Sequence, residues 1–475
     1  MTALLPAIHR GQAPSLAKSD EKGVVILQDY RMPYRTLFSE MRSFVLIWAG
    51  QLVSVLGSSL TSFALGVWVY QRTGSATKFA LVAFFATLPG IIISPLAGAV
   101  ADRWDRRSVM ILCDFGSGLC VFAVAVLLYF NSLEIWHIYI INGVKSIFIT
   151  SQGPAYIAAT TLLVPKRHLG RASGMIQLND AVGQIIAPAL AVGLITAIHL
   201  WGVIFIDFLT FLFAVVVLLS TPVPKLTSLS SDGKERRPSL VRSATYGWSY
   251  ITTRPGLLGL LIFFAVNNFL IGFVIVLSTP LMLSFATPRA LATALSFGGF
   301  GMLVGSVFMS AWGGPKRRVK GVVGFYLLVG LCIVIMGSQP SVPLITVAVF
   351  FLSLSLPVII GSSQTIWQSK VALDVQGRVF AVRRMIAWAS MPLAYLIAGP
   401  LADHVFEPLL AVNGSLAGSV GRLIGVGRGR GIGLLYIVLG VFVLLAAAVA
   451  CLYPRLRLVE DELPDVIADH AVVKA

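Results

Sequence analysis

Long apolar runs recur along the whole sequence, and they limit what this chain can fold into more than any other feature. Two examples are FALVAFFATLPGIIISPLA, which begins at residue 79, and VMILCDFGSGLCVFAVAVLLYF, which begins at residue 109. A helix needs roughly 20 mostly apolar residues to cross a bilayer, and it satisfies its backbone hydrogen bonds within the segment. The hydrophobic fraction of 57% lies above the roughly 45–50% of soluble domains. The sequence therefore predicts an all-α integral membrane protein, without the alternating strands of a membrane barrel.

Twelve apolar stretches are predicted transmembrane helices. They lie at residues 43–70, 78–100, 108–130, 134–163, 171–198, 201–220, 256–285, 290–312, 320–338, 342–369, 377–401 and 432–453. The loops between them alternate in charge, with eighteen Lys and Arg residues in one set and six in the other. Basic residues near helix ends stay on the cytoplasmic side, so we expect both termini in the cytoplasm. The net charge of +16 then reflects topology and not nucleic-acid binding, and the polar first 40 residues predict no cleavable signal peptide.

Two basic landmarks repeat at nearly the same interval, which indicates an internal duplication. Arg317 follows Arg106 by 211 positions, and Arg378 follows Arg171 by 207. Parallel repeats of this size form the halves of many secondary transporters, with the substrate site between the halves near the midplane. The predicted organisation is a cytoplasmic extension (1–42), a six-helix bundle (43–220), a cytoplasmic linker (221–255), a second six-helix bundle (256–453) and a cytoplasmic tail (454–475).

The stretch GAVADRWDRR, residues 98–107, concentrates charge in a chain of which only 12% is charged. As a bare pattern it fits an ordinary solvated turn that obeys the positive-inside rule. Its acidic residue Asp102 can also accept hydrogen bonds from the N-terminus of a neighbouring helix, where the macrodipole favours negative charge. The arginines can hold carboxylates or lipid phosphates.

This stretch looks like motif A of the major facilitator superfamily, and the resemblance covers roughly residues 43–453. It implies two pseudo-symmetric six-helix bundles and a latch that closes the cytoplasmic side in the outward-facing state. The latch residues by this resemblance are Gly98, Asp102, Arg103, Arg106 and Arg107. Family members often carry an acidic partner for the arginines at the cytoplasmic end of the fourth span, and none occurs between Lys145 and Arg171.

Further stretches resemble the branch of macrolide and enterobactin exporters. These are IDFLTFLF in the sixth span, LVPKRHLGRASG after the fourth, and PLAYLIAGPLAD in the eleventh. The fifth span matches the spacing of that branch's antiporter motif at Gly174, Gly183 and Pro188, although three glycines of the motif are replaced. The resemblance implies a drug–proton antiporter, and an importer of the same fold is the nearest alternative.

Four charged residues fall inside predicted spans, where each charge costs about 2.5–3.5 kcal/mol and requires a reason. They are Lys145, Asp180, Asp207 and Asp114. In one interpretation they pair with each other and stabilise the N-terminal half. In the other, Lys145 faces the central cavity and Asp180 or Asp207 exchanges a proton during the cycle, because burial disfavours the charged form. We expect Arg383 and Arg384 to extend toward lipid headgroups.

By the same resemblance, the first, fourth, seventh and tenth spans line the cavity. The polar or aromatic residues on these spans are Gln51, Ser54, Asn142, Gln152, Asn267, Asn268, Gln364 and Trp367. Each could equally form a hydrogen bond between helices. An apolar wall with few polar points would suit a bulky amphiphilic cargo.

Several classes of site are not indicated by the sequence. Cys113, Cys120, Cys332 and Cys451 are scattered within spans and match neither a disulfide framework nor a metal site. The glycine-rich segment GVGRGRGIG, residues 425–433, lacks the Lys-Ser/Thr of a phosphate loop, and we expect a flexible loop there. No cofactor is predicted, and an integral-membrane enzyme or a non-transporting receptor remains a weaker alternative.

The predicted function is export of a hydrophobic or amphiphilic small molecule (a drug, siderophore or secondary metabolite), coupled to protons. We expect a monomer in the cell membrane, surrounded by lipids.

Overall fold

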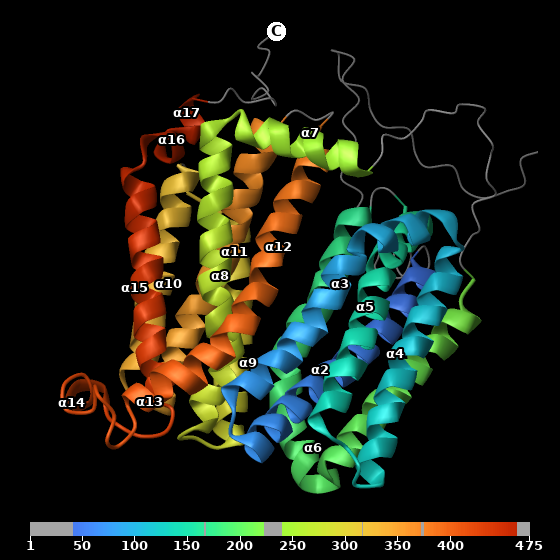
Figure 1. Cartoon of the computed structure of the whole chain (residues 1–475). Helices are drawn as coiled ribbons and strands as arrows, with labels where there is room; N and C mark the ends of the chain where they lie inside the picture. The colour runs from blue at the N-terminus through green and yellow to red at the C-terminus, as the bar shows by residue number, and fades with distance from the viewer. Residues whose placement is uncertain (1–40, 166–167, 223–239, 316, 372–374, 463–475) are drawn as a thin grey trace, which may run out of the picture.

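The computed structural model describes residues 41–165, 168–222, 240–315, 317–371 and 375–462, and these form helices with no strand among them (Figure 1). The long helices are α2 (Arg42–Thr73), α3 (Ala76–Arg103), α4 (Arg106–Tyr129), α5 (Ile135–Leu163), α6 (Leu169–Ser220), α8 (Pro255–Leu283), α9 (Pro288–Trp312), α10 (Arg318–Ser338), α11 (Val342–Lys370), α12 (Gln376–Pro400) and α15 (Arg430–Leu452). The shorter elements are α7 (Leu240–Thr252), the π-helix η2 (Leu401–Phe406), α13 (Glu407–Leu409), α14 (Gly421–Ile424), α16 (Pro454–Arg457) and α17 (Val459–Glu462).

Every predicted span is occupied by helix over most of its length, and ten helices of the described chain are long and apolar enough to cross a membrane. The expected boundary between the fifth and sixth spans lies inside α6. There the backbone breaks at His199, which adopts φ 58° and ψ 176°. A positive φ is unusual for a residue with a Cβ, and it interrupts the helix where the sequence predicted a turn.

Local capping signals explain several helix boundaries. Gly74 ends α2 in the left-handed conformation, at φ 61°, which a glycine adopts without steric cost. The Thr287 side chain accepts a hydrogen bond from the Ala290 amide at the start of α9, and Pro288 occupies the first turn. Thr287 thus satisfies one backbone donor that a helix N-terminus leaves without a partner, and Pro288 has no such donor.

The helices form two bundles that lie side by side, α2–α6 in one and α8–α15 in the other (Figure 1). Their outward faces are apolar: Leu112, Phe115, Leu119 and Phe122 of α4 are 41–56% exposed and recur at helical spacing. Such a stripe is unfavourable in water and suits contact with lipid. Inside the C-terminal bundle, α10 and α15 approach so closely that a methyl group at Gly337 would collide with the Gly433 carbonyl. Small residues permit this kind of packing between membrane helices.

The two bundles meet most closely at one end. We call the end that carries α7, α16 and α17 the α7 end, and the opposite one the α13 end. The helices of the two bundles converge toward the α13 end and diverge toward the α7 end (Figure 1). Hydrogen bonds between described residues join the bundles where Asp403 of η2 accepts from the start of α3. A second link is the bond that the Ser296 hydroxyl donates to the Ile185 carbonyl at 2.8 Å.

The predicted topology can be tested at two exposed positions at opposite ends of the molecule. Ser132 follows α4 at the α13 end, and Thr253 follows α7. In a variant without the four native cysteines, Ser132→Cys should react with a membrane-impermeant maleimide in intact cells. Thr253→Cys should react only after permeabilisation. If both cysteines were labelled from the same side of the membrane, the chain between them could not cross the membrane an odd number of times, and the predicted topology would be wrong.

Candidate functional site

A buried carboxylate held by two amides lies inside the N-terminal bundle. Asp114 of α4 is 1% exposed. Gln51 of α2 donates through Nε2 to Asp114 Oδ2 at 2.7 Å, and Gln152 of α5 donates to Oδ1 at 2.7 Å. Gln152 also donates to Gln51 Oε1 at 3.2 Å. Both carboxylate oxygens therefore have a donor, but no described basic side chain forms an ion pair with Asp114.

A second buried acid in the same bundle does have a cation. Lys145 Nζ of α5 lies 3.7 Å from Asp207 Oδ2 of α6. At this distance the contact is an ion pair and not a hydrogen bond. Ser58 of α2 bridges the pair, since it accepts from Lys145 Nζ at 3.3 Å and donates to Asp207 Oδ1 at 3.4 Å. The Lys145 ammonium also lies 5.2 Å from the ring centre of Phe211, a favourable cation–π distance.

Close packing of α2 against α6 holds this pair in place. A Cβ at Gly57 would come within 2.9 Å of Asp207 Oδ1 and would also collide with the Thr210 hydroxyl. The glycine therefore lets the Asp207 side chain lie against α2, where Ser58 can reach it. Of the two interpretations of the intramembrane charges, mutual pairing holds for Lys145 and Asp207. The residue that sequence reasoning missed is Ser58, one helical turn from the predicted Ser54.

In the C-terminal bundle an arginine lies elsewhere than the sequence suggested. Arg383 of α12 does not extend toward a headgroup region but folds back on α11. It donates to Gln364 Oε1 at 3.0 Å and to Ser363 Oγ at 3.2 Å, and its guanidinium lies 5.1 Å from the centre of the Trp367 ring. These neighbours supply acceptors and a π-face that a lipid-facing position lacks, which corrects the headgroup expectation for Arg383. Arg384, in contrast, is exposed.

The remaining predicted cavity residues have mixed environments. Asn267 is fully buried and donates to the Phe263 carbonyl of its own helix at 2.8 Å. Asn268 donates to the Ala387 carbonyl of α12 at 3.3 Å, so it connects two helices. Ser54 is buried on α2, and Asn142 is half-buried on α5.

The motif A stretch, residues 98–107, covers the end of α3, the turn that follows and the start of α4. Asp105 caps α4 by accepting from the Ser108 amide at 3.1 Å and from its hydroxyl at 2.9 Å. Arg107 donates to the carbonyls of Leu218 and Leu219, at 2.8 and 2.6 Å. These carbonyls belong to the last turn of α6, where a cation is favoured. Arg107 thus has backbone partners in place of the missing carboxylate. Arg106 is half-buried, and the side-chain environments of Gly98, Asp102 and Arg103 lie outside the described part of the structure.

The predicted residues of the fifth span, which lie on α6, have different surroundings. Gly183 packs against α2, because a Cβ there would lie 2.8 Å from Ser59 Oγ, whereas nothing lies within 4 Å of a Cβ at Gly174. Pro188 is buried within α6. The side chain of Asp180 is outside the described residues, so its proposed proton exchange stays a prediction.

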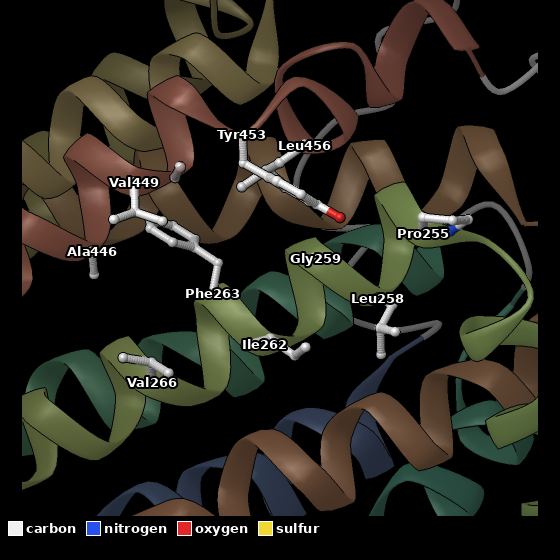
Figure 2. Close-up of a pocket in the computed structure, with 11 residues that line it drawn as sticks. Pro255, Leu258, Gly259, Ile262, Phe263, Val266, Ala446, Val449, Tyr453 and Leu456 are labelled. Atoms are coloured by element: carbon white, nitrogen blue, oxygen red, sulfur yellow. The ribbon is translucent and has the colours of Figure 1, made fainter.

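A groove of about 400 Å³ lies away from these polar clusters, between α8, α15 and α16 (Figure 2). Its walls are apolar side chains such as Leu258, Phe263 and Val449, and Tyr453 contributes one hydroxyl near the α16 end. Ile262 and Val449 are 53% and 63% exposed. This chemistry is that of a lipid-facing surface and offers no group that could orient a polar cargo.

Comparison with known proteins identifies related sequences. The family model described as Major Facilitator Superfamily matches residues 47–395. Macrolide efflux protein A of Streptococcus pyogenes is 26% identical over 367 residues, which are 76% of this chain and 90% of that protein. The multidrug efflux pump Tap of Mycolicibacterium fortuitum is 26% identical over 376 residues, covering 76% of this chain and 89% of the pump.

Solved structures share the fold at low identity. A bacterial homologue of the human lysosomal transporter Spinster, in an inward-facing and unoccupied conformation, aligns with a TM-score of 0.62 at 15% identity. That alignment covers 88% of this chain and 97% of the other. The nucleoside transporter NupG aligns with a TM-score of 0.61 at 12% identity, over 86% of this chain and 98% of NupG.

The buried ion pair predicts a distinctive stability pattern. Lys145→Met should destabilise the protein by about 3–5 kcal/mol, because Asp207 would keep a buried charge without a cation. Adding Asp207→Asn should restore most of this loss, since the remaining side chains are neutral. Thermal unfolding of the purified variants in detergent measures both effects. Equal destabilisation of the single and double variants would show that pairing is not what holds this region together.

Proposed function

Because this chain belongs to the Major Facilitator Superfamily, we propose that it exports a hydrophobic or amphiphilic small molecule in exchange for protons. The chain is a transporter and not an enzyme, and it is a multi-pass protein of the cell membrane. Relatives named for macrolide efflux and multidrug efflux support export over import. Secondary transporters of this architecture alternate access by rocking one repeat against the other around a fixed site.

The proposal includes the full predicted topology. The chain crosses the membrane twelve times with both termini in the cytoplasm, and residues 43–220 and 256–453 are the rocking halves. The halves are flanked or joined by the extension 1–42, the linker 221–255 and the tail 454–475. The α7 end then faces the cytoplasm and the α13 end faces outside. In this proposal the α7 end, toward which the bundles diverge (Figure 1), is the end that opens to the cytoplasm. The transporter acts as a monomer.

The observation that carries proton coupling is the environment of Asp114. An ionised carboxylate without a cation inside a membrane protein costs several kcal/mol. Two neutral amides reduce this cost by hydrogen bonding but leave the net charge in place. Binding of a proton removes the charge, so loading and release of a proton change the free energy of this site. Gln51 and Gln152 connect the site to α2 and α5, so protonation can alter how these helices pack.

The Lys145–Asp207 pair has a different role in this proposal. Because its charges compensate each other, the pair braces α2, α5 and α6 and needs no proton. This assigns the coupling role to Asp114 first and leaves Asp180 as a second proton site.

Cargo contact is proposed for the polar residues of the helices that resemble cavity-lining spans. In the C-terminal half the Gln364, Trp367 and Arg383 group offers a hydrogen-bonding amide, an aromatic face and a cation in one place. In the N-terminal half Ser54, Asn142 and Gln152 offer neutral polar groups. The inner latch at Asp102 would form when the cytoplasmic side closes.

Direction and energy source can be tested together. Cells that express this transporter and lack other macrolide exporters should accumulate less radiolabelled erythromycin than control cells. A protonophore should abolish the difference. Higher accumulation than in control cells would indicate import, and efflux that persists with the protonophore would exclude proton coupling.

Asp114→Asn should abolish proton-driven efflux while the protein still folds, because Asn fills the same volume but cannot take up a proton. We expect at least about a tenfold fall in the drug-induced proton release from acidified inverted vesicles, a loss typical of removing a proton-transfer group. The double variant Lys145→Met with Asp207→Asn is the matched control and should keep most of its proton release. Normal proton release by Asp114→Asn would remove this residue from the mechanism.

A further inference from the structure

Asp403 forms the best-defined polar contact between the two bundles. It lies on η2, directly after α12, and accepts three hydrogen bonds from the start of α3. Ser75 donates through its hydroxyl at 2.7 Å, and the amides of Ala76 and Thr77 donate at 3.0 and 2.9 Å. A carboxylate at a helix N-terminus satisfies backbone donors and interacts favourably with the macrodipole. Here the helix and its capping carboxylate belong to different bundles.

Neighbouring contacts bring the same two elements together. Gly399 of α12 lies against the backbone of α3, and a Cβ at this position would collide with Thr77. Close by, the Arg428 guanidinium lies 5.8 Å from the centre of the Tyr70 ring at the end of α2. The glycine thus permits the approach that allows the Asp403 carboxylate to reach the first turn of α3.

Two other carboxylates cap helices in the same chemical manner but within one bundle. Glu407 accepts from the amides of Gly429 and Ile432 at the start of α15, both at 3.1 Å. This contact also secures the end of the glycine-rich segment, which the sequence suggested to be a flexible loop. Glu460 accepts from the amides of Arg318 and Val319 at the start of α10, again at 3.1 Å. Separation of the bundles would leave both of these caps intact and would break only the cap at Asp403.

The sequence around Asp403 repeats part of the motif A stretch. Residues 398–403 read AGPLAD, and residues 97–102 read AGAVAD. The first hexapeptide spans the junction of α12 and η2 toward the α13 end, and the second lies near the end of α3 at the α7 end. Each stretch thus carries a glycine and an aspartate four residues later. In the structure, the α12 copy is engaged with α3.

We propose that the contact between Asp403 and the start of α3 is an outer gate, which keeps the chamber closed at the α13 end. The Asp403 carboxylate must leave the first turn of α3 whenever the chamber opens to the outside, so these three hydrogen bonds set the population of the outward-open state. This inference rests on the proposed alternating access, but it does not depend on the cargo or on the coupling ion. Loss of the contact shifts the equilibrium toward the outward-open state without disturbing either bundle.

The test measures access to a residue hidden behind this contact. Ala80 of α3 is 1% exposed, one turn beyond Ala76, and packs in a core shared with the C-terminal bundle. In a variant without native cysteines, Ala80→Cys should react slowly with an impermeant maleimide added outside intact cells. Adding Asp403→Asn should raise the labelling rate about tenfold, since hydrogen bonds to a charged group are worth more than neutral ones. Adding Glu460→Gln, which weakens a cap within one bundle and away from this interface, should leave the rate unchanged.

A second variant acts from the other side of the contact. Ala76→Pro removes the amide that bonds to Asp403 Oδ1, and proline is well tolerated in the first turn of a helix. It should raise the labelling rate as Asp403→Asn does, and it keeps the test decisive if Asp403→Asn fails to reach the membrane. Unchanged labelling in these variants, or an equal rise with Glu460→Gln, overturns the gate. Labelling needs no cargo, so a negative labelling result would leave the export proposal standing. Conversely, if efflux were absent but the labelling rates changed as expected, only the export proposal would fail.

Discussion

Within the membrane every polar group must find its partner inside the protein, because lipid supplies neither hydrogen bonds nor counter-ions. Helices meet this requirement for the backbone, and side chains must meet it individually. Three solutions occur in this chain. Lys145 and Asp207 neutralise each other, Arg383 binds an amide, a hydroxyl and an aromatic face, and Asp114 binds two amides. Among these, only the Lys145–Asp207 pair has charges that cancel each other. The pair therefore suits a structural role, whereas Asp114 could change its charge by binding a proton.

The same constraint applies at helix ends, where backbone amides have no intrahelical partner. Carboxylates cap the starts of α10 and α15 from within the C-terminal bundle, which helps to hold that bundle together as a unit. Asp403 caps α3 from the opposite bundle. In the proposed transport cycle the bundles rock by breaking contacts that cross their interface, and Asp403 forms three of these contacts. We therefore expect the Asp403 contact to influence this motion more than the stability of either half.

Motif A shows how local and distant contacts combine in one short stretch. Asp105 caps its own helix, and Arg107 binds the last carbonyls of α6. Both contacts fix the α3–α4 turn relative to the N-terminal bundle. In the proposed transport cycle, Asp102 is the residue of the motif that makes an exchangeable contact with the other bundle. Arg107 needs no acidic partner on the fourth span, because helix carbonyls at the end of α6 take that place.

The sequence by itself determined the helical class, the positions of the long helices and the family, because apolar length and the spacing of motif A are local properties. It also identified Asp114, Lys145 and Asp207 as charges that need a reason. It could not determine that Lys145 meets Asp207 while Asp114 meets Gln51 and Gln152. The Asp114 contacts alone span 63 and 38 positions, and helix rotation decides which side chains face each other. Arg383 was misplaced for the same reason: its acceptors lie on α11. The Asp403 contact spans 328 positions, and only the packing of the two bundles brings its partners together.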